Sequence, residues 1–174
     1  TGEKYSLKYA DGKLTIRVSD SRDSESVVWT GANGSIWDLM ESENFASSDN
    51  KFVSGDNVTF DDTAVKTDVE INEDLAPGNI VFNNNSKVYT LSGNGAIEGN
   101  GSVTLKGKSA VNIKNTNRYT GGTYIDGGYL RPATLANKDG LEYGSLGAAD
   151  NTITMSNQGK LWVNIAMTSS HPIV

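Results

Sequence analysis

Cysteine is absent from this 174-residue sequence, and histidine occurs once, at His171 beside a proline. Without thiols the chain forms neither a disulfide nor a thiolate metal site. A single histidine near the end of the chain, with no serine elbow to activate, gives none of the usual pairings of nucleophile and base. We therefore expect no catalytic residue of this kind and interpret His171 as a tail residue.

Positive charge and long apolar runs are also scarce. The 15 Lys and Arg residues face 21 Asp and Glu residues, for a formal net charge of -6, which repels nucleic acid phosphates and anionic lipid. No apolar run approaches the roughly 20 residues that cross a bilayer, and no signal segment opens the sequence. The sequence predicts no nucleic-acid partner and no direct membrane insertion of this segment. It fits either an intracellular protein or an internal or processed piece of a larger one.

Glycine and asparagine are abundant, with 19 glycines in all. The segment "GNGAIEGNG", Gly93 to Gly101, has a superficial likeness to a dinucleotide loop, but its third glycine falls one residue late and no helical pattern follows. A phosphate cradle needs a loop that opens a helix, so no cofactor is expected. Ten asparagines between Asn72 and Asn117 instead favour stacked corners, where amides bond along a ladder of strands.

Residues 1–57 are predicted to form an N-terminal hairpin and capping region. Apolar and polar residues alternate over positions 4–18 on either side of Asp11-Gly12, a dipeptide that favours a type I′ hairpin turn. A polar stretch at 19–26 is typical of an exposed loop. Two interpretations stay open for positions 34–45: a short helix capped by Ser35, or an irregular loop anchored by Trp37.

Residues 58–174 have the pattern of an all-β solenoid. Short strand-like triplets recur there, each followed within a few residues by Asn, Gly, Ser or Asp. A set of large apolar residues recurs with a period in the twenties, as expected for solenoid coils of two or three strands, and we expect it to form a buried column. These residues are Phe60, Phe82, Leu105, Leu130 and Met155. A β-sandwich would also give many short strands, but it needs hairpins that this region rarely encodes.

Two segments carry a resemblance to a known family. "NTNRYTGGTYIDGGYL" has a Tyr-Thr-Gly-Gly-Thr core, a strand, a glycine and a leucine; "YGSLGAADNTITMSNQGKLWV" has a Leu-Gly turn and a strand ending near Gly-x-Leu. Together they resemble the autotransporter-associated β-strand repeat, at about positions 103–163. The corresponding positions are Tyr119, Gly121, Gly122, Thr123, Gly128, Leu130, Leu146, Gly147, Ile153, Gly159, Lys160 and Leu161. Upstream, "VVWTGANGSIWD" and "FVSGDNVTFDD" resemble the segment that often precedes this repeat.

The resemblance implies a right-handed parallel β-helix, a passenger segment exposed on or released from a Gram-negative cell surface. The implied localisation is the cell surface, outer membrane-associated or secreted, and the implied partner is a host or bacterial surface protein or glycan. The chain departs from the family pattern in two respects. We expect no translocator barrel within this sequence, because 174 residues leave no room for one beside a passenger, and Ile173-Val174 resembles the start of another coil.

Aromatic side chains are the best candidates for a binding surface, because they stack on sugar rings and anchor protein partners. The candidates are Trp29, Trp37, Tyr119, Tyr124 and Tyr129. A structural role stays open beside this one. Trp29 and Trp37 would close the N-terminal end of the solenoid, and Tyr119 would pack beside the glycine pair.

Acidic residues suggest chemistry only weakly. Glycoside hydrolysis needs two carboxyl groups roughly 5–10 Å apart, but the adjacent residues Asp61 and Asp62 would point to opposite faces of a strand, which favours a structural turn. With Asp56 and Asn57 they would offer oxygen ligands to calcium, although no loop spacing supports such a site. The sequence therefore assigns no catalytic, cofactor-binding or metal-binding residue.

The leading hypothesis is a non-enzymatic passenger fragment that acts as a β-helical scaffold or adhesin. The alternative is a carbohydrate-binding or carbohydrate-cleaving β-helix, suggested by the aromatic residues and the acidic turn. A third interpretation is a folding or linker module within a much longer passenger. In every case Gly121 and Gly128 are predicted to occupy bends where a larger residue would destabilise the fold.

Overall fold

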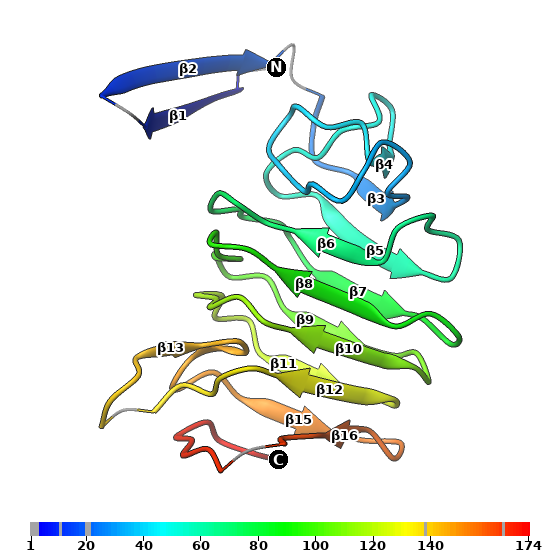
Figure 1. Cartoon of the computed structure of the whole chain (residues 1–174), viewed down its shortest axis with the longest axis vertical. Helices are drawn as coiled ribbons and strands as arrows, with labels where there is room; N and C mark the ends of the chain where they lie inside the picture. Colours follow the sequence, from blue (N-terminus) through cyan, green and yellow to red (C-terminus); the bar gives the residue numbers. More distant parts are fainter. Residues whose placement is uncertain (1–3, 11, 20–21, 138, 165) are drawn as a thin grey trace.

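The computed structural model describes the chain except residues 1–3, 11, 20–21, 138 and 165 (Figure 1). The described residues are all-β, with strands, turns and bends but no helix. None of them therefore forms a helix that is suited to cross a membrane. Stacked parallel strands build a β-solenoid that follows an N-terminal hairpin (Figure 1), which confirms the predicted fold class.

The hairpin lies apart from the stack in Figure 1. Strand β1 (Lys4–Ala10) pairs antiparallel with β2 (Lys13–Ser19), as predicted, while Asp11 of the predicted turn lies outside the described residues. The register sets Leu7 opposite Ile16 and Tyr9 opposite Leu14. These four side chains are all more than half exposed, so they add nothing to the solenoid core.

Two sheets form the regular walls of the solenoid. In the seven-stranded sheet, all neighbouring strands are parallel except β4, which pairs antiparallel with β3. In the five-stranded sheet, all neighbouring strands are parallel. In sheet order, the seven-stranded sheet contains β15 (Ile153–Met155), β11 (Thr123–Ile125), β9 (Val103–Leu105), β7 (Ile80–Asn83), β5 (Asn57–Asp61), β3 (Ser26–Trp29) and β4 (Phe45–Ala46). The five-stranded sheet contains β16 (Lys160–Leu161), β12 (Tyr129–Pro132), β10 (Ala110–Ile113), β8 (Tyr89–Ser92) and β6 (Asp68–Glu70).

The predicted buried column is correct in its first three members and wrong in its fourth. Phe60 pairs with Phe82 and Phe82 with Leu105, but the next residue in this column is Ile125 of β11. Leu130 lies instead in β12 of the other sheet, where it is also buried. The last member, Met155, pairs with Ile125 but is 38% exposed, because it lies on the last coil.

The third side of each coil is irregular but closely stacked. Leu75 and Ile97 form a parallel bridge there. A Cβ on Gly101 would lie 1.8 Å from the carbonyl oxygen of Gly78, and a Cβ on Gly121 would lie 2.5 Å from the carbonyl oxygen of Gly101. The first glycine pair of "YTGGTYIDGGYL" thus begins where successive backbones touch, so its role is architectural.

Asparagine side chains bond successive coils together. The Asn57 Oδ1 atom accepts a hydrogen bond from the Asn79 backbone amide at 2.8 Å, and the Asn79 Oδ1 atom accepts one from the Ser102 amide at 3.1 Å. In the interior, the Asn117 Oδ1 atom accepts a bond from the Ile97 amide at 2.9 Å. This is the stacked-corner role that the asparagine content predicts.

Aromatic side chains close the N-terminal end of the stack. Ring centroids in this cluster lie 5.2–6.0 Å apart, and all its members are buried: Trp29, Trp37, Phe45, Phe52 and Phe60. The segment 34–45 that supplies Trp37 is an irregular loop. Of the two interpretations of this segment, the helix is therefore wrong and the anchored loop is confirmed.

The coil between β12 and β15 carries a long excursion. Within it, β13 (Tyr143–Gly144) pairs antiparallel with β14 (Gly147–Ala148), and Figure 1 shows this hairpin projecting from the stack. After β16 the chain returns to the first sheet, where Ile173 forms a parallel bridge with Ile153. The segment at 173–174 thus begins another coil, as its sequence indicates.

Candidate functional site

Three of the five aromatic candidates contribute no exposed surface. Trp29, Trp37 and Tyr119 are at most 1% exposed, so the prediction that they form a binding surface is corrected to a structural role. The Trp29 Nε1 atom donates to the Lys66 carbonyl oxygen at 2.7 Å, and the Tyr119 hydroxyl lies 2.7 Å from the Thr123 Oγ1 atom. Burial raises the pKa of Tyr119 above its ordinary value, which keeps this phenol neutral.

The other two candidates lie on different sheets. Tyr124 is 43% exposed on β11, where it borders a shallow pocket of about 260 Å³ beside Gly122 and Asn151. Tyr129 lies on β12 of the five-stranded sheet and is half-buried. The structure therefore does not bring Tyr124 and Tyr129 together into one aromatic surface.

The acidic candidates are occupied by structural hydrogen bonds. The Asp61 Oδ1 atom accepts bonds from the Thr63 amide and hydroxyl, as in a turn. Asp62 accepts bonds of 2.9–3.1 Å from the backbone amides of residues 85–87 in the next coil. These amides, with that of Lys87 first, lower the pKa of Asp62 to about 2. The structural turn is therefore confirmed for this pair.

Asp56 is held by a buried ion pair. It is fully buried, and its two carboxylate oxygens receive the two terminal nitrogens of Arg22 at 2.7 and 2.6 Å. The amides of Glu25 and Val53 also donate to it, each at 2.8 Å. Among the described residues, no group of three or more His, Cys, Asp or Glu side chains is placed to hold a metal ion.

His171 is buried, which corrects its interpretation as a loose tail residue. It is 6% exposed, and its Nδ1 atom lies 2.8 Å from the Asn151 carbonyl oxygen. Its Nε2 atom is buried without a hydrogen-bond partner. The ring thus anchors the returning segment against the coil of β15.

The most distinctive exposed surface combines aromatic and cationic side chains of β12, of β16 and of the residue that follows β16. We call Tyr129, Arg131, Lys160 and Trp162 the aromatic–cationic patch. Strands β12 and β16 pair parallel, with Tyr129 beside Lys160. The Lys160 Nζ atom lies 4.8 Å from the centroid of the Tyr129 ring.

Further along β12 and just past the end of β16, Arg131 and Trp162 form a second pair in which a cation lies over an aromatic ring. The Trp162 amide donates to the Leu130 carbonyl oxygen at 2.8 Å, which places Trp162 beside Arg131. The Arg131 Cζ atom lies 4.8 Å from the centroid of the Trp162 ring, and the Tyr129 and Trp162 centroids are 5.9 Å apart. Each cation therefore rests on the ring of the neighbouring coil, a contact that orders all four side chains.

A shallow pocket of about 400 Å³ adjoins this patch. It is lined by Lys108, Gly127, Gly128, Tyr129, Asn157, Gln158 and Lys160. Two of these residues are lysines and none is acidic. Asp126 lies on the adjoining turn, but its Oδ1 atom accepts bonds from the Ser156 hydroxyl and the Asn157 amide group. Among the described residues, no carboxylate forms an ion pair with Lys108, Arg131 or Lys160.

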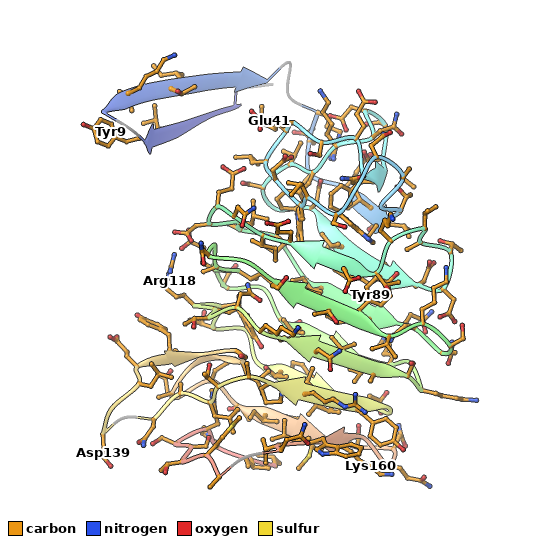
Figure 2. The ribbon with its side chains drawn as sticks, in the orientation of Figure 1. Tyr9, Glu41, Tyr89, Arg118, Asp139 and Lys160 are labelled. Carbon is orange, nitrogen blue, oxygen red and sulfur yellow. The ribbon has the colours of Figure 1, made fainter. Side chains whose placement is uncertain are left out.

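Arg118 shows the opposite electrostatic arrangement. Its Nη2 atom lies 2.6 Å from Asp74 and 3.0 Å from Glu98, on the coils that precede it. These carboxylates, with Glu98 first, raise the pKa of Arg118 above its ordinary value. Figure 2 shows Arg118 and Lys160 on opposite sides of the solenoid. Arg118 borders a pocket of about 480 Å³ that also contains Glu142 and Asp150, so its charge is already balanced.

Sequence reasoning found Tyr129 but missed the rest of the patch. The signal was present in the first three residues of "YLRP" and of "KLWV", each of which has a leucine between an aromatic and a cationic residue. When the two segments are stacked one coil apart, Tyr129 lies beside Lys160 and Arg131 lies beside Trp162. Each pair thus joins an aromatic residue to a cationic one. Seeing this requires the register of β12 and β16, which the spacing of apolar residues does not provide.

Comparison with known proteins returns no family model, curated protein or solved structure that matches this chain.

Proposed function

We propose that this chain is a non-enzymatic, β-helical scaffold segment of a bacterial cell-surface or secreted protein. The observation that carries the proposal is the parallel stacking of strands β3 to β16, apart from β4 and the β13–β14 hairpin, in two sheets on a continuous buried core. Each coil contacts its neighbours through strands, asparagine bonds and closely packed glycine corners. Such a stack is extended and stiff, and it presents side chains outward at fixed intervals.

The resemblance to the autotransporter-associated repeat supports the surface location. The "YTGGT" segment leads into β11, "GGYL" into β12, and "NTITM" and "GKL" supply β15 and β16. The glycines of the motif lie at bends: Gly122 and Gly128 have positive φ angles of 92° and 61°. The backbone bends therefore explain why the motif has glycine at these positions. The partner class that we propose with this location is a host or bacterial surface protein or glycan.

The carbohydrate-cleaving alternative gains no support from the acidic turn. Asp61 is engaged with Thr63, and Asp62 with three backbone amides of the next coil. A glycosidase needs one carboxyl group with a raised pKa to act as the acid, whereas the pKa of Asp62 is lowered. Sugar binding without cleavage depends on other residues and is treated below.

The proposal is tested by locating the protein and assaying its activity. An epitope-tagged full-length protein, expressed in the bacterium that encodes it, should be cleaved by protease added to intact cells or recovered from the medium. Reducing-sugar assays on neutral and acidic polysaccharides should show no release above a heat-denatured control. A tag protected inside intact cells would overturn the location, and released sugar would overturn the non-enzymatic assignment.

A further inference from the structure

We propose that the aromatic–cationic patch and its adjoining pocket bind an acidic polysaccharide, a chain of sugars that carry carboxylate groups. This goes beyond the scaffold role and does not depend on where the protein is located. The inference rests on three features of the described residues: uncompensated positive charge, an exposed aromatic ring, and a pocket of suitable size lined by amides.

The charge argument begins with the acidity of the chain as a whole. A net charge of -6 leaves few cations to spare, and Arg118 and Arg22 are both paired with carboxylates. Lys108, Arg131 and Lys160 lie together on one surface, and the described residues place no carboxylate against them. A local cluster of unpaired cations on an acidic protein favours an anionic ligand at that place.

Arg131 is prepared for a planar anion such as a carboxylate. Its guanidinium group is stacked on Trp162, and its Nε atom is buried without a hydrogen-bond partner. No described residue accepts a hydrogen bond from its terminal nitrogens. Because stacking already fixes the group, a bidentate carboxylate bond would cost little side-chain entropy.

The outward face of the same sheet changes character along the stack. The ladder column that ends beside Trp162 runs from Asp68 through Thr90 and Asn112 to Arg131. The acidic end is therefore separated from the cationic end by neutral coils. An elongated anion would be repelled at the first end and held at the second, which positions it across the last coils.

The remaining groups favour a sugar over a simple anionic peptide. Trp162 is 47% exposed, and an exposed aromatic ring beside a groove suits the apolar face of a pyranose. Asn157 and Gln158 line the pocket on a turn with positive φ angles, and carboxamides bond to hydroxyl groups. At about 400 Å³, the pocket falls in the range of small-ligand sites.

The test uses the whole chain with two matched sugars. A hexamer of α-1,4-linked galacturonate is the probe, and the methyl ester of the same hexamer is the neutral control, with the same sugar backbone and linkage. Calorimetry should show binding of the acidic hexamer that weakens as salt rises, and binding of the neutral hexamer at least about tenfold weaker. Equal binding of both hexamers, or no binding of the acidic one, would overturn the proposal.

Variants locate the binding on the protein. Lys160→Gln and Arg131→Gln should each weaken binding about tenfold, and Trp162→Ala should weaken it without a change in the salt dependence. Lys66→Gln removes another exposed lysine near the other end of the solenoid and should leave affinity unchanged. An equal loss in Lys66→Gln would show that only net charge matters and would overturn the site.

A peptide control separates sugar recognition from charge recognition. Hexaglutamate carries the same number of side-chain carboxylates as the galacturonate hexamer but offers no pyranose face. It should bind at least about tenfold more weakly and should be insensitive to Trp162→Ala. If hexaglutamate binds as tightly as the sugar, the patch recognises acidic chains in general and the polysaccharide assignment is wrong.

Discussion

The two ends of the solenoid use aromatic residues in opposite ways. At the N-terminal end, Trp29 and Trp37 lie inside a cluster of five buried rings, and the antiparallel strand β4 covers the outer edge of β3. On the last coil, Trp162 lies on the outward face and is 47% exposed. The same residue type thus closes the core at one end and forms a surface at the other.

This difference shows that residue type alone does not decide whether an aromatic side chain of a solenoid is buried or exposed. In the N-terminal coils, the inward positions of the seven-stranded sheet carry Phe60 and Phe82, whose rings stack at 4.8 Å, and the capping rings extend that column. On the last coil, the inward position of β16 is taken by Leu161, so Trp162 is outward by alternation. Burial follows from position in the register rather than from side-chain type.

The largest predicted contrast is in stability. Trp37→Ala should lower the free energy of unfolding by about 3–5 kcal/mol, because it leaves a large cavity among packed rings. Trp162→Ala should lower it by less than about 1 kcal/mol, because it removes a surface ring that is 47% exposed. Urea unfolding of both variants beside the unmodified chain measures this, and equal losses would break the distinction between the two ends.

Glycine corners should give the next largest effect. Gly121→Val and Gly128→Val should each destabilise the fold by about 1 kcal/mol or more, because an added Cβ would lie about 2.5 Å from backbone atoms of the preceding coil. Gly140→Val is the control, since a Cβ there meets nothing within 4 Å. Melting temperatures of the three variants test this prediction. An unchanged melting temperature for Gly121→Val would mean that the coils move apart at little cost, which would contradict the close backbone contact.

The smallest effect concerns acidic side chains that join coils at each end. The folded-state pKa of Asp62, about 2, lies below its ordinary value of 3.8, so its bonds stabilise the fold fully above pH 3.8 and are lost as pH falls through 2. Asp62→Asn should therefore reduce stability at pH 6 and make little difference near pH 2.

Asp126 provides the matched comparison on the last coils. The hydroxyl of Ser156 and then the side chain of Asn157 lower its pKa as well, but it accepts no backbone amide bonds among those described. Asp126→Asn should cost less at pH 6 than Asp62→Asn. Thermal unfolding at the two pH values checks this, and a larger cost for Asp126→Asn would contradict the account.

The sequence predicts the solenoid because its early coils are regular. Phe60, Phe82 and Leu105 follow one another at nearly even spacing and do stack. The next interval, to Ile125, is shorter, and the interval from there to Met155 is longer, since the β13–β14 excursion lies between β12 and β15. The short and the long interval average to the expected period. Leu130 lies midway between Leu105 and Met155 in the sequence, so it matches this average, although it belongs to the other sheet.

The aromatic–cationic patch was much harder to predict than the fold. Tyr119 and Tyr129 stand in similar glycine-rich surroundings, yet one is buried and the other borders the patch. The patch itself depends on pairing β12 with β16, two strands that are separated along the chain by the β13–β14 excursion and by β15. No local pattern records such a pairing, so Arg131, Lys160 and Trp162 become recognisable only when the coils are stacked.

The contrast between the two ends is tested most directly by iodide quenching of tryptophan fluorescence. The chain has three tryptophans, of which Trp29 and Trp37 are buried and Trp162 is exposed. The account predicts one quenchable component in the folded chain, which disappears in Trp162→Phe and is restored on unfolding in urea. If folded Trp162→Phe is quenched as strongly as the unmodified chain, the N-terminal aromatic cluster is open to solvent and the account is wrong.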